Sequence, residues 1–137
     1  MSTTENKENN SIEILVPFIL NYEDFENLMC GAIEGGSNDW AEINSDALPD
    51  IIKEKYKGKP FSVKVCKAIW EGHNVTVYDA EDSEGPWIVN LESLKKGLNL
   101  FATEQKEHFN NFVNENDDAT TSDVFFQLIT IGEVMFG

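Results

Sequence analysis

Apolar residues along this chain change their spacing close to Asn90. Before that position, the segment Phe61–Trp70 alternates apolar residues with polar ones, as half-buried strands do. After it, apolar residues recur every three or four positions, which is typical of amphipathic helices. A set of strands followed by a run of helices predicts a single α+β domain.

Four strands of one antiparallel sheet are expected before Asn90. The first contains Pro17, which favours an edge or bulged strand. The second and third are joined by Glu71–Asn74, a polar segment with a glycine, which predicts a β-hairpin. The predicted strands are residues 12–20, 61–70, 75–79 and 87–89.

Helical segments are expected to pack on this sheet. Asn21 and Asn90 are suitable N-cap residues, and Gly35-Gly36 predicts a left-handed C-cap at the end of the first helix. The last helix is apolar on most sides, so we expect it at the centre of the fold or at a subunit interface. Its apolar residues are too many for one core, which predicts a homo-oligomer, most simply a dimer. The predicted helices are residues 22–34, 48–56, 91–113 with a break, and 121–135.

The 137 residues are enough for one domain with one core. Residues 1–10 are polar and are expected to form a flexible N-terminal arm, with the domain at residues 11–137. We expect neither a signal peptide nor a membrane span, because no apolar run is long enough. Cys30 and Cys66 lie beside apolar residues and are expected to be buried, reduced thiols.

The net charge of the chain indicates which kinds of molecule it can bind. Twenty-five acidic residues face ten basic ones, all lysine, which gives a formal net charge of −15. Such a chain repels nucleic acid and anionic membranes and is attracted to basic protein surfaces. Carboxylates gather in two predicted loops, whereas six of the ten lysines lie between Lys53 and Lys67. The candidate partner-binding residues are Asp79, Glu81, Asp82, Glu84, Glu115, Asp117 and Asp118.

The turn at Glu34–Trp40 is a candidate ligand site. Consecutive backbone N–H groups in a Gly-Gly-Ser-Asn turn can bind an anion, and Trp40 offers a stacking face. Asp39 works against an anionic ligand. The alternative is an ordinary helix end and turn, with Trp40 packed on the core. The candidate ligand-binding residues are Gly35, Gly36, Ser37, Asn38 and Trp40.

Neither a catalytic nor a metal site is expected from the residue pattern. His73 and His108 are the only histidines, and with the two cysteines they show no zinc-ligand spacing. The chain contains no nucleophile elbow, P-loop or EF-hand motif. We therefore expect a protein that is not an enzyme and has no cofactor.

Two stretches resemble a family of small acidic proteins encoded by phages and prophages. CGAIEGGSNDWAEI (Cys30–Ile43) is similar to that family's AIEGGSNYW helix-turn, and NDDATTSDVFFQLITIGEVMFG (Asn116–Gly137) is similar to its closing segment. Further similarity lies in NVTVYDAEDSEGPWIVNLESLKKGLNLF, so the resemblance covers most of the chain after residue 20. Asp39 stands where the family pattern has an aromatic residue. The resemblance implies a phage accessory protein working in the cytoplasm of a bacterial host.

Two functions remain as hypotheses. In the first, the protein counters a host defence system by binding a basic, nucleic-acid-handling host protein through its acidic surface. In the second, an oligomer sequesters a small nucleotide-type ligand in a pocket around Gly35–Trp40. The ordinary alternative to the first is that the charge only keeps the protein soluble.

Overall fold

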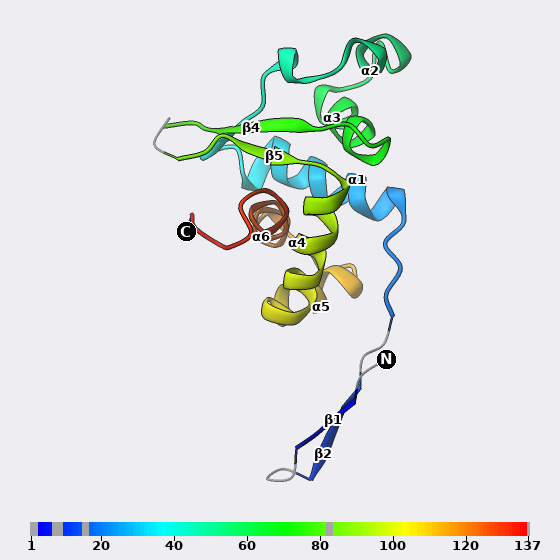
Figure 1. The fold of residues 1–137 in the computed structure, drawn as a ribbon, viewed down its shortest axis with the longest axis vertical. Helices are drawn as coiled ribbons and strands as arrows, with labels where there is room; N and C mark the ends of the chain where they lie inside the picture. Colours follow the sequence, from blue (N-terminus) through cyan, green and yellow to red (C-terminus); the bar gives the residue numbers. More distant parts are fainter. Residues whose placement is uncertain (1–2, 7–9, 15–16, 82–83, 137) are drawn as a thin grey trace.

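A computed structural model describes residues 3–6, 10–14, 17–81 and 84–136 of the chain. These residues form an α+β fold that combines helices with a small antiparallel sheet (Figure 1). The α-helices are α1 (Tyr22–Gly31), α2 (Asp50–Lys55), α3 (Phe61–Trp70), α4 (Leu91–Glu104), α5 (Lys106–Val113) and α6 (Ala119–Thr130). A π-helical segment, η1 (Ala32–Gly36), continues α1, and a short 3-10 turn, η2 (Ser45–Ala47), precedes α2.

The sheet consists of three short antiparallel strands in the order β3 (Ala41–Glu42), β4 (Val75–Asp79) and β5 (Trp87–Val89). β4 and β5 lie at the predicted positions. Ala41 pairs with Asp79, and the carbonyl of Trp40 accepts a 2.7 Å hydrogen bond from the N–H of Ala80. This pairing places the Glu34–Trp40 turn beside the start of the acidic loop that follows β4.

Helix α6 lies at the centre of the fold and is seen nearly end-on in Figure 1. Phe125, Phe126 and Ile129 are at most 1% exposed, and α6 contacts α1, α4, α5, η1 and β5. Helix α4 crosses it at Gly97, where a Cβ atom would lie 2.5 Å from the Cα of Ile129. The central position predicted for the last helix is therefore confirmed.

The prediction of a strand at residues 61–70 is wrong, because this segment is helix α3. Pro60 precedes the helix in an extended conformation, and Phe61, Val65 and Ile69 recur every four residues, so the segment also has a helical apolar face. Gly72, at φ +96°, then follows the helix end, and the segment 71–74 connects α3 to β4. The hairpin of the sheet is β4–β5.

The predicted first strand is also changed. Among the described residues of this range, only 12–14 are in a strand, β2 (Ser11–Ile14), and residues 17–20 are not. β2 pairs with β1 (Thr3–Asn6) rather than with the sheet. Figure 1 shows this pair extending away from the helices. The sheet therefore has three strands instead of the predicted four, and the pairing runs across the predicted boundary between residues 10 and 11.

The other helices follow the predicted ranges with shifted ends. The break in the predicted helix 91–113 falls at Gln105, between α4 and α5. Helix α6 ends at Thr130, five residues before the predicted end, and Gly132 follows at φ +94°. The side chain of Asn21 accepts from the N–H of Asp24, and that of Asn90 from Ser93, as N-caps do.

The reason given for a homodimer does not hold in this fold. The predicted excess of apolar residues on the last helix is largely absorbed by one chain, because this helix is surrounded by neighbours on most sides. Val134 and Met135 lie beyond the helix and are each 41% exposed. The oligomeric state stays a prediction. Among the described residues, no helix has both the length and the apolar character needed to cross a bilayer.

Candidate functional site

The turn after α1 is shaped by a close approach to α6. Gly36 ends the π-helical segment, and a Cβ atom there would lie only 2.1 Å from the carbonyl oxygen of Ala119. The predicted left-handed glycine C-cap is wrong, since neither Gly35 nor Gly36 has a positive φ. Glycine is required at residue 36 by space rather than by backbone conformation.

The side chain of Asp123, on α6, holds this turn. Its Oδ1 accepts hydrogen bonds of 2.7 Å from both the hydroxyl of Ser37 and the indole N–H of Trp40. Ser37 is fully buried and Trp40 is 6% exposed. One carboxylate oxygen therefore satisfies two buried donors, which come from a segment more than eighty positions earlier in the chain.

Gln127 extends this arrangement to the C-terminal tail. Its side chain is fully buried, and its Nε2 donates to Asp123 Oδ2 and to the carbonyl oxygen of Phe136, each at 2.9 Å. Its Oε1 accepts from the backbone N–H groups of Met135 and Phe136, each at 2.8 Å. All the hydrogen-bonding capacity of the amide is used, so its orientation is fixed. We call Ser37, Trp40, Asp123 and Gln127 the Asp123 network.

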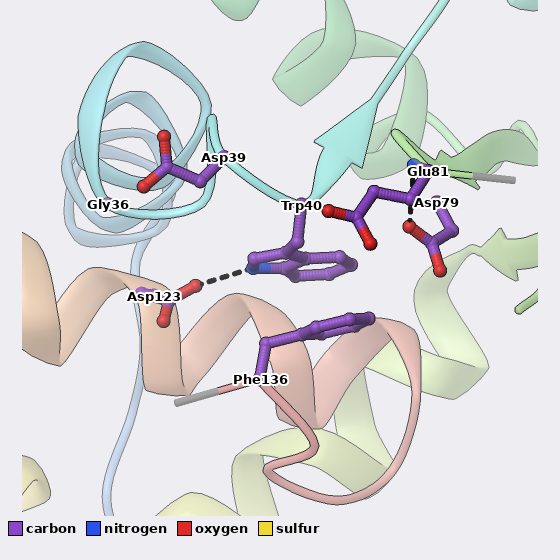
Figure 2. A pocket seen from close by; sticks show the side chains of 7 residues that line it. All are labelled: Gly36, Asp39, Trp40, Asp79, Glu81, Asp123 and Phe136. Atoms are coloured by element: carbon purple, nitrogen blue, oxygen red, sulfur yellow. Dashed lines mark hydrogen bonds between the residues drawn. The ribbon is translucent and has the colours of Figure 1, made fainter. Parts of the chain in front are cut away.

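The tail places Phe136 on the face of Trp40. The two rings are nearly parallel, with an interplanar angle of 11° and centroids 4.9 Å apart (Figure 2). Trp87 and Phe126 contact other parts of Trp40 at 5.8 and 5.6 Å between centroids. Trp40 is thus packed in the core, as in the alternative reading of the turn, and little of its surface remains for a ligand.

A pocket of about 220 Å³ opens beside this aromatic pair. Asp79, 4% exposed, accepts from the backbone N–H of Glu81 at 2.9 Å and from that of Glu84 at 3.1 Å. Figure 2 shows Asp39 on one side of Trp40, with Glu81 and Asp79 on the other. We call this the acidic pocket; its lining residues are Gly36, Asp39, Trp40, Asp79, Glu81, Asp123 and Phe136.

A second pocket, of about 250 Å³, is also lined by residues of the turn. Its lining is mainly apolar, with Glu42 as its acidic member. The hydroxyl of Ser37 donates its hydrogen bond to Asp123, so it cannot donate one to a ligand in this pocket. The lining residues are Ile33, Ser37, Asn38, Ala41, Glu42, Ile43, Phe61 and Phe126.

The predicted ligand-binding residues are divided between the two pockets. Gly36 and Trp40 line the acidic pocket, Ser37 and Asn38 line the apolar one, and Gly35 is exposed and lines neither. The N–H groups of Ser37, Asn38 and Trp40 bond to carbonyl groups within residues 32–37. These three amides are therefore not available to the anion-binding nest that the sequence suggested.

The predicted partner-binding residues are likewise separated. Asp79 and Glu81 line the acidic pocket, and Glu84 helps to fix Asp79 through its N–H. Asp82 lies outside the described residues. Glu115, Asp117 and Asp118 are exposed in the segment before α6, away from the pocket lining. Asp118 also caps α6, and the N–H of Thr121 lowers the pKa of its carboxyl.

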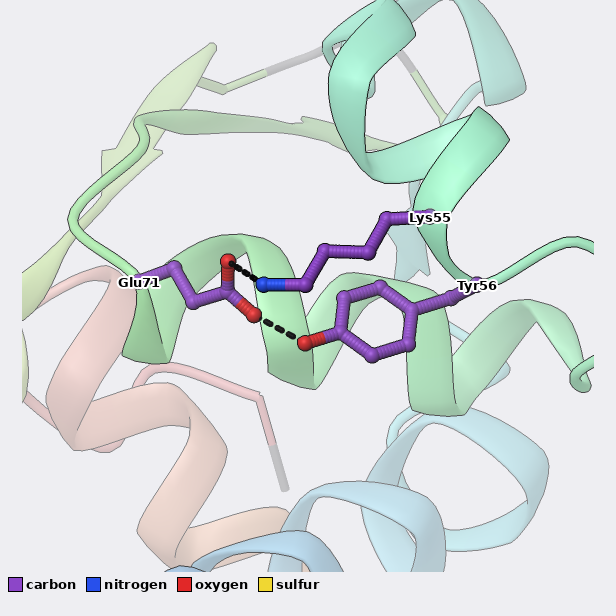
Figure 3. Close-up of polar contacts among 3 residues, drawn as sticks. All are labelled: Lys55, Tyr56 and Glu71. Atoms are coloured by element: carbon purple, nitrogen blue, oxygen red, sulfur yellow. Dashed lines mark hydrogen bonds and ion pairs between the residues drawn. The ribbon is translucent and has the colours of Figure 1, made fainter.

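Basic side chains gather on a different part of the molecule, around α2 and α3. Lys55 forms a 3.1 Å ion pair with Glu71, which also accepts a hydrogen bond from the hydroxyl of Tyr56 (Figure 3). Lys67 lies 3.8 Å from the ring centroid of Tyr22, a cation–π contact. Acidic side chains such as Glu71 also lie in this region, whereas no lysine or histidine is among the described lining of the acidic pocket.

Neither histidine joins the site. His108 shares a 3.0 Å hydrogen bond with Thr121, and His73 lies in the connection between α3 and β4. Within the described part of the chain, no three His, Cys, Asp or Glu side chains are close enough to hold a metal ion.

Sequence reasoning missed Asp123, Gln127 and Phe136. A signal was present, because Asp123 and Gln127 lie four positions apart with only apolar residues between them. Such residues on a buried helix face must have hydrogen-bond partners. The two stretches that carry the family resemblance, Cys30–Ile43 and Asn116–Gly137, are also the two that the Asp123 network joins.

Comparisons with protein-family models, curated proteins and solved structures gave no significant match to this chain.

Proposed function

We propose that this protein is a non-enzymatic binding protein that docks on a basic surface of another protein. In this proposal, the acidic pocket receives a lysine or arginine side chain of the partner. The observation that carries the proposal is the lining of the pocket, where Asp39, Asp79, Glu81 and Asp123 surround the rim of the Trp40–Phe136 pair. Carboxylates beside aromatic carbon suit an alkyl chain that ends in a cation.

The rest of the molecule supports a cationic partner. The formal net charge of −15 steers basic surfaces toward the protein, and the described lining of the acidic pocket holds no basic side chain that would oppose a cation. The exposed residues Glu115, Asp117 and Asp118 add to this field without lining the pocket.

The biological setting that we propose comes from the family resemblance. The protein is a phage-type accessory protein that acts in the cytoplasm of a bacterial host and counters a defence system. Its target is a host protein that handles nucleic acid, because such proteins present basic surfaces that an acidic protein can cover.

Sequestration of a nucleotide-type ligand is the weaker of the two hypotheses. Two pockets that residues of the turn help to line support a small-molecule site. However, four acidic side chains line one pocket, and three turn amides are bonded internally. Both features disfavour a phosphate-bearing ligand.

The proposal is tested with an arginine-rich peptide and its citrulline analogue, which has nearly the same shape but no charge. Isothermal titration calorimetry should show binding of the arginine peptide and little binding of the citrulline peptide. The double variant Asp39→Asn/Glu81→Gln removes two exposed pocket carboxylates. It should weaken binding by about two- to thirtyfold, since each exposed charged pair contributes about 0.2–1 kcal/mol.

A matched control separates the pocket from the general field. Glu54→Gln/Glu92→Gln removes the same number of exposed charges outside the pocket, so it should weaken binding only slightly. Equal losses in the two double variants would refute the pocket and leave only diffuse charge attraction. Recovery of a nucleotide from the purified protein would instead favour sequestration.

A further inference from the structure

Helices α1 and α3 bring the two cysteines of the chain together. Cys30 is at the end of α1 and is half-buried, whereas Cys66 lies in α3 and is fully buried. Both are free thiols. Cys30 Sγ lies 3.5 Å from the hydroxyl oxygen of Ser62, and Cys66 follows Ser62 by one turn of α3, so the two thiols lie on the facing sides of α1 and α3. Their separation of 36 positions in the sequence gave no sign of this contact.

A line of hydrogen bonds leads from Cys30 to the surface. The thiol of Cys30 donates to the hydroxyl oxygen of Ser62, with Sγ and Oγ 3.5 Å apart. The hydroxyl of Ser62, which is 3% exposed, donates in turn to a carboxylate oxygen of Glu34. Glu34 is exposed. A proton that leaves Cys30 therefore has a path through Ser62 and Glu34 to water.

The two thiols differ in their acidity. The hydrogen bond from Cys66 is the largest influence on Cys30 and lowers the pKa of its thiol to about 7, although burial and Glu34 act in the opposite direction. Donation of the same bond, together with burial, raises the pKa of Cys66. Near neutral pH the thiolate therefore forms at the more accessible sulfur, and thiolate is the reactive form of cysteine.

We propose that Cys30 is a peroxide-reactive thiol whose oxidation ends in a disulfide with Cys66. In the first step, the Cys30 thiolate attacks one oxygen of hydrogen peroxide. A sulfur–oxygen bond forms, the oxygen–oxygen bond breaks, and the hydroxide that leaves takes up a proton to become water. Cys30 is oxidised to a sulfenic acid, and the peroxide is reduced.

In the second step, the sulfur of Cys66 attacks the sulfenic sulfur. The sulfur–sulfur bond forms, the sulfur–oxygen bond breaks, and the oxygen leaves as water with the thiol proton of Cys66. Two thiols and one hydrogen peroxide thus give one disulfide and two waters. Cys66 is suited to this resolving role because it is buried beside Cys30, where external reagents do not reach it.

This proposal is independent of the proposed function, because none of these side chains lines the acidic pocket. The test is treatment of the purified full chain with hydrogen peroxide, followed by thiol counting with Ellman's reagent under denaturing conditions and by intact mass spectrometry. The wild type should lose both thiols and two hydrogen atoms, and a reductant should restore both.

Two variants assign the roles. Cys66→Ala should stop at the sulfenic acid of Cys30, which dimedone traps, whereas Cys30→Ser should leave Cys66 unmodified. Circular dichroism checks that each variant is folded, and Cys66→Ser replaces Cys66→Ala if the alanine variant is not. Two free thiols in the treated wild type, or Cys30 over-oxidised beside an intact Cys66 thiol, would overturn the proposal.

Discussion

Removal of the Asp123 carboxylate should destabilise the protein more than its partly exposed position suggests. In Asp123→Ala, the hydroxyl of Ser37 and the indole N–H of Trp40 lose their acceptor, and both residues are at least 94% buried. Each buried donor left without a partner costs about 1–3 kcal/mol. The two together predict a loss of about 2–6 kcal/mol in the free energy of unfolding.

Asp123→Asn should cost about half as much. Its carbonyl oxygen can still accept from Ser37 and Trp40, although without charge assistance. Its NH₂ group must then face Nε2 of Gln127, another donor, and Gln127 cannot turn over because its Oε1 is held by two backbone N–H groups. Weaker bonds to the first two donors and one lost bond predict a cost of about 1–3 kcal/mol.

Urea denaturation followed by circular dichroism measures these losses, with Glu92→Gln as an exposed control. A double-mutant cycle adds a second check, because Ser37→Ala should cost much less in the Asp123→Ala background than in the wild type. Equal stability of Asp123→Ala and the control would refute the network as a source of stability. Strict additivity of Ser37→Ala and Asp123→Ala would refute the hydrogen bond between these residues.

Two further predictions concern single positions. Gly36→Ala should destabilise by about 1–3 kcal/mol in the same urea assay, because its Cβ would lie 2.1 Å from the carbonyl oxygen of Ala119. Gly35→Ala, with no atom within 4 Å of the new Cβ, should be neutral or stabilising, so equal losses at the two glycines would contradict this reasoning. The lowered pKa of Asp118 adds stability at pH values above its ordinary pKa of 3.8, and that stability is lost as the pH falls through the folded-state pKa. Asp118→Asn should therefore lose less stability on acidification than the wild type does, and parallel pH profiles of the urea midpoint would show that the cap does not titrate as inferred.

The fold class was predictable from the sequence, but the helical structure of residues 61–70 was not. The segment Phe61–Trp70 alternates in its first six residues, which favours a strand, and it also repeats apolar residues every four positions, which favours a helix. The packing of the segment favours the helix, because a helix places Val65, Cys66 and Ile69 together in the core against α1. A short apolar segment fits both periods, and only the partner on which it packs distinguishes them.

The candidate site was located in part. The charge pattern pointed to Asp79 and Glu81, and the glycine turn pointed to Gly36 and Trp40, all of which line the acidic pocket. That these two groups meet was not predictable, because it depends on the pairing of β3 with β4. Asp123 was passed over because its partners, Ser37 and Trp40, lie more than eighty positions away in the sequence.

The order in which the parts of the pocket are synthesised has a consequence for folding in the cell. Trp40 is synthesised more than eighty residues before its acceptor Asp123 and its stacking partner Phe136. Contacts between such distant positions form late, because the long intervening chain must be ordered first. Until then, the indole ring and the buried turn are exposed to solvent and to other chains. A slow or stalled ribosome would therefore prolong the period in which this segment can be captured by a chaperone or can aggregate.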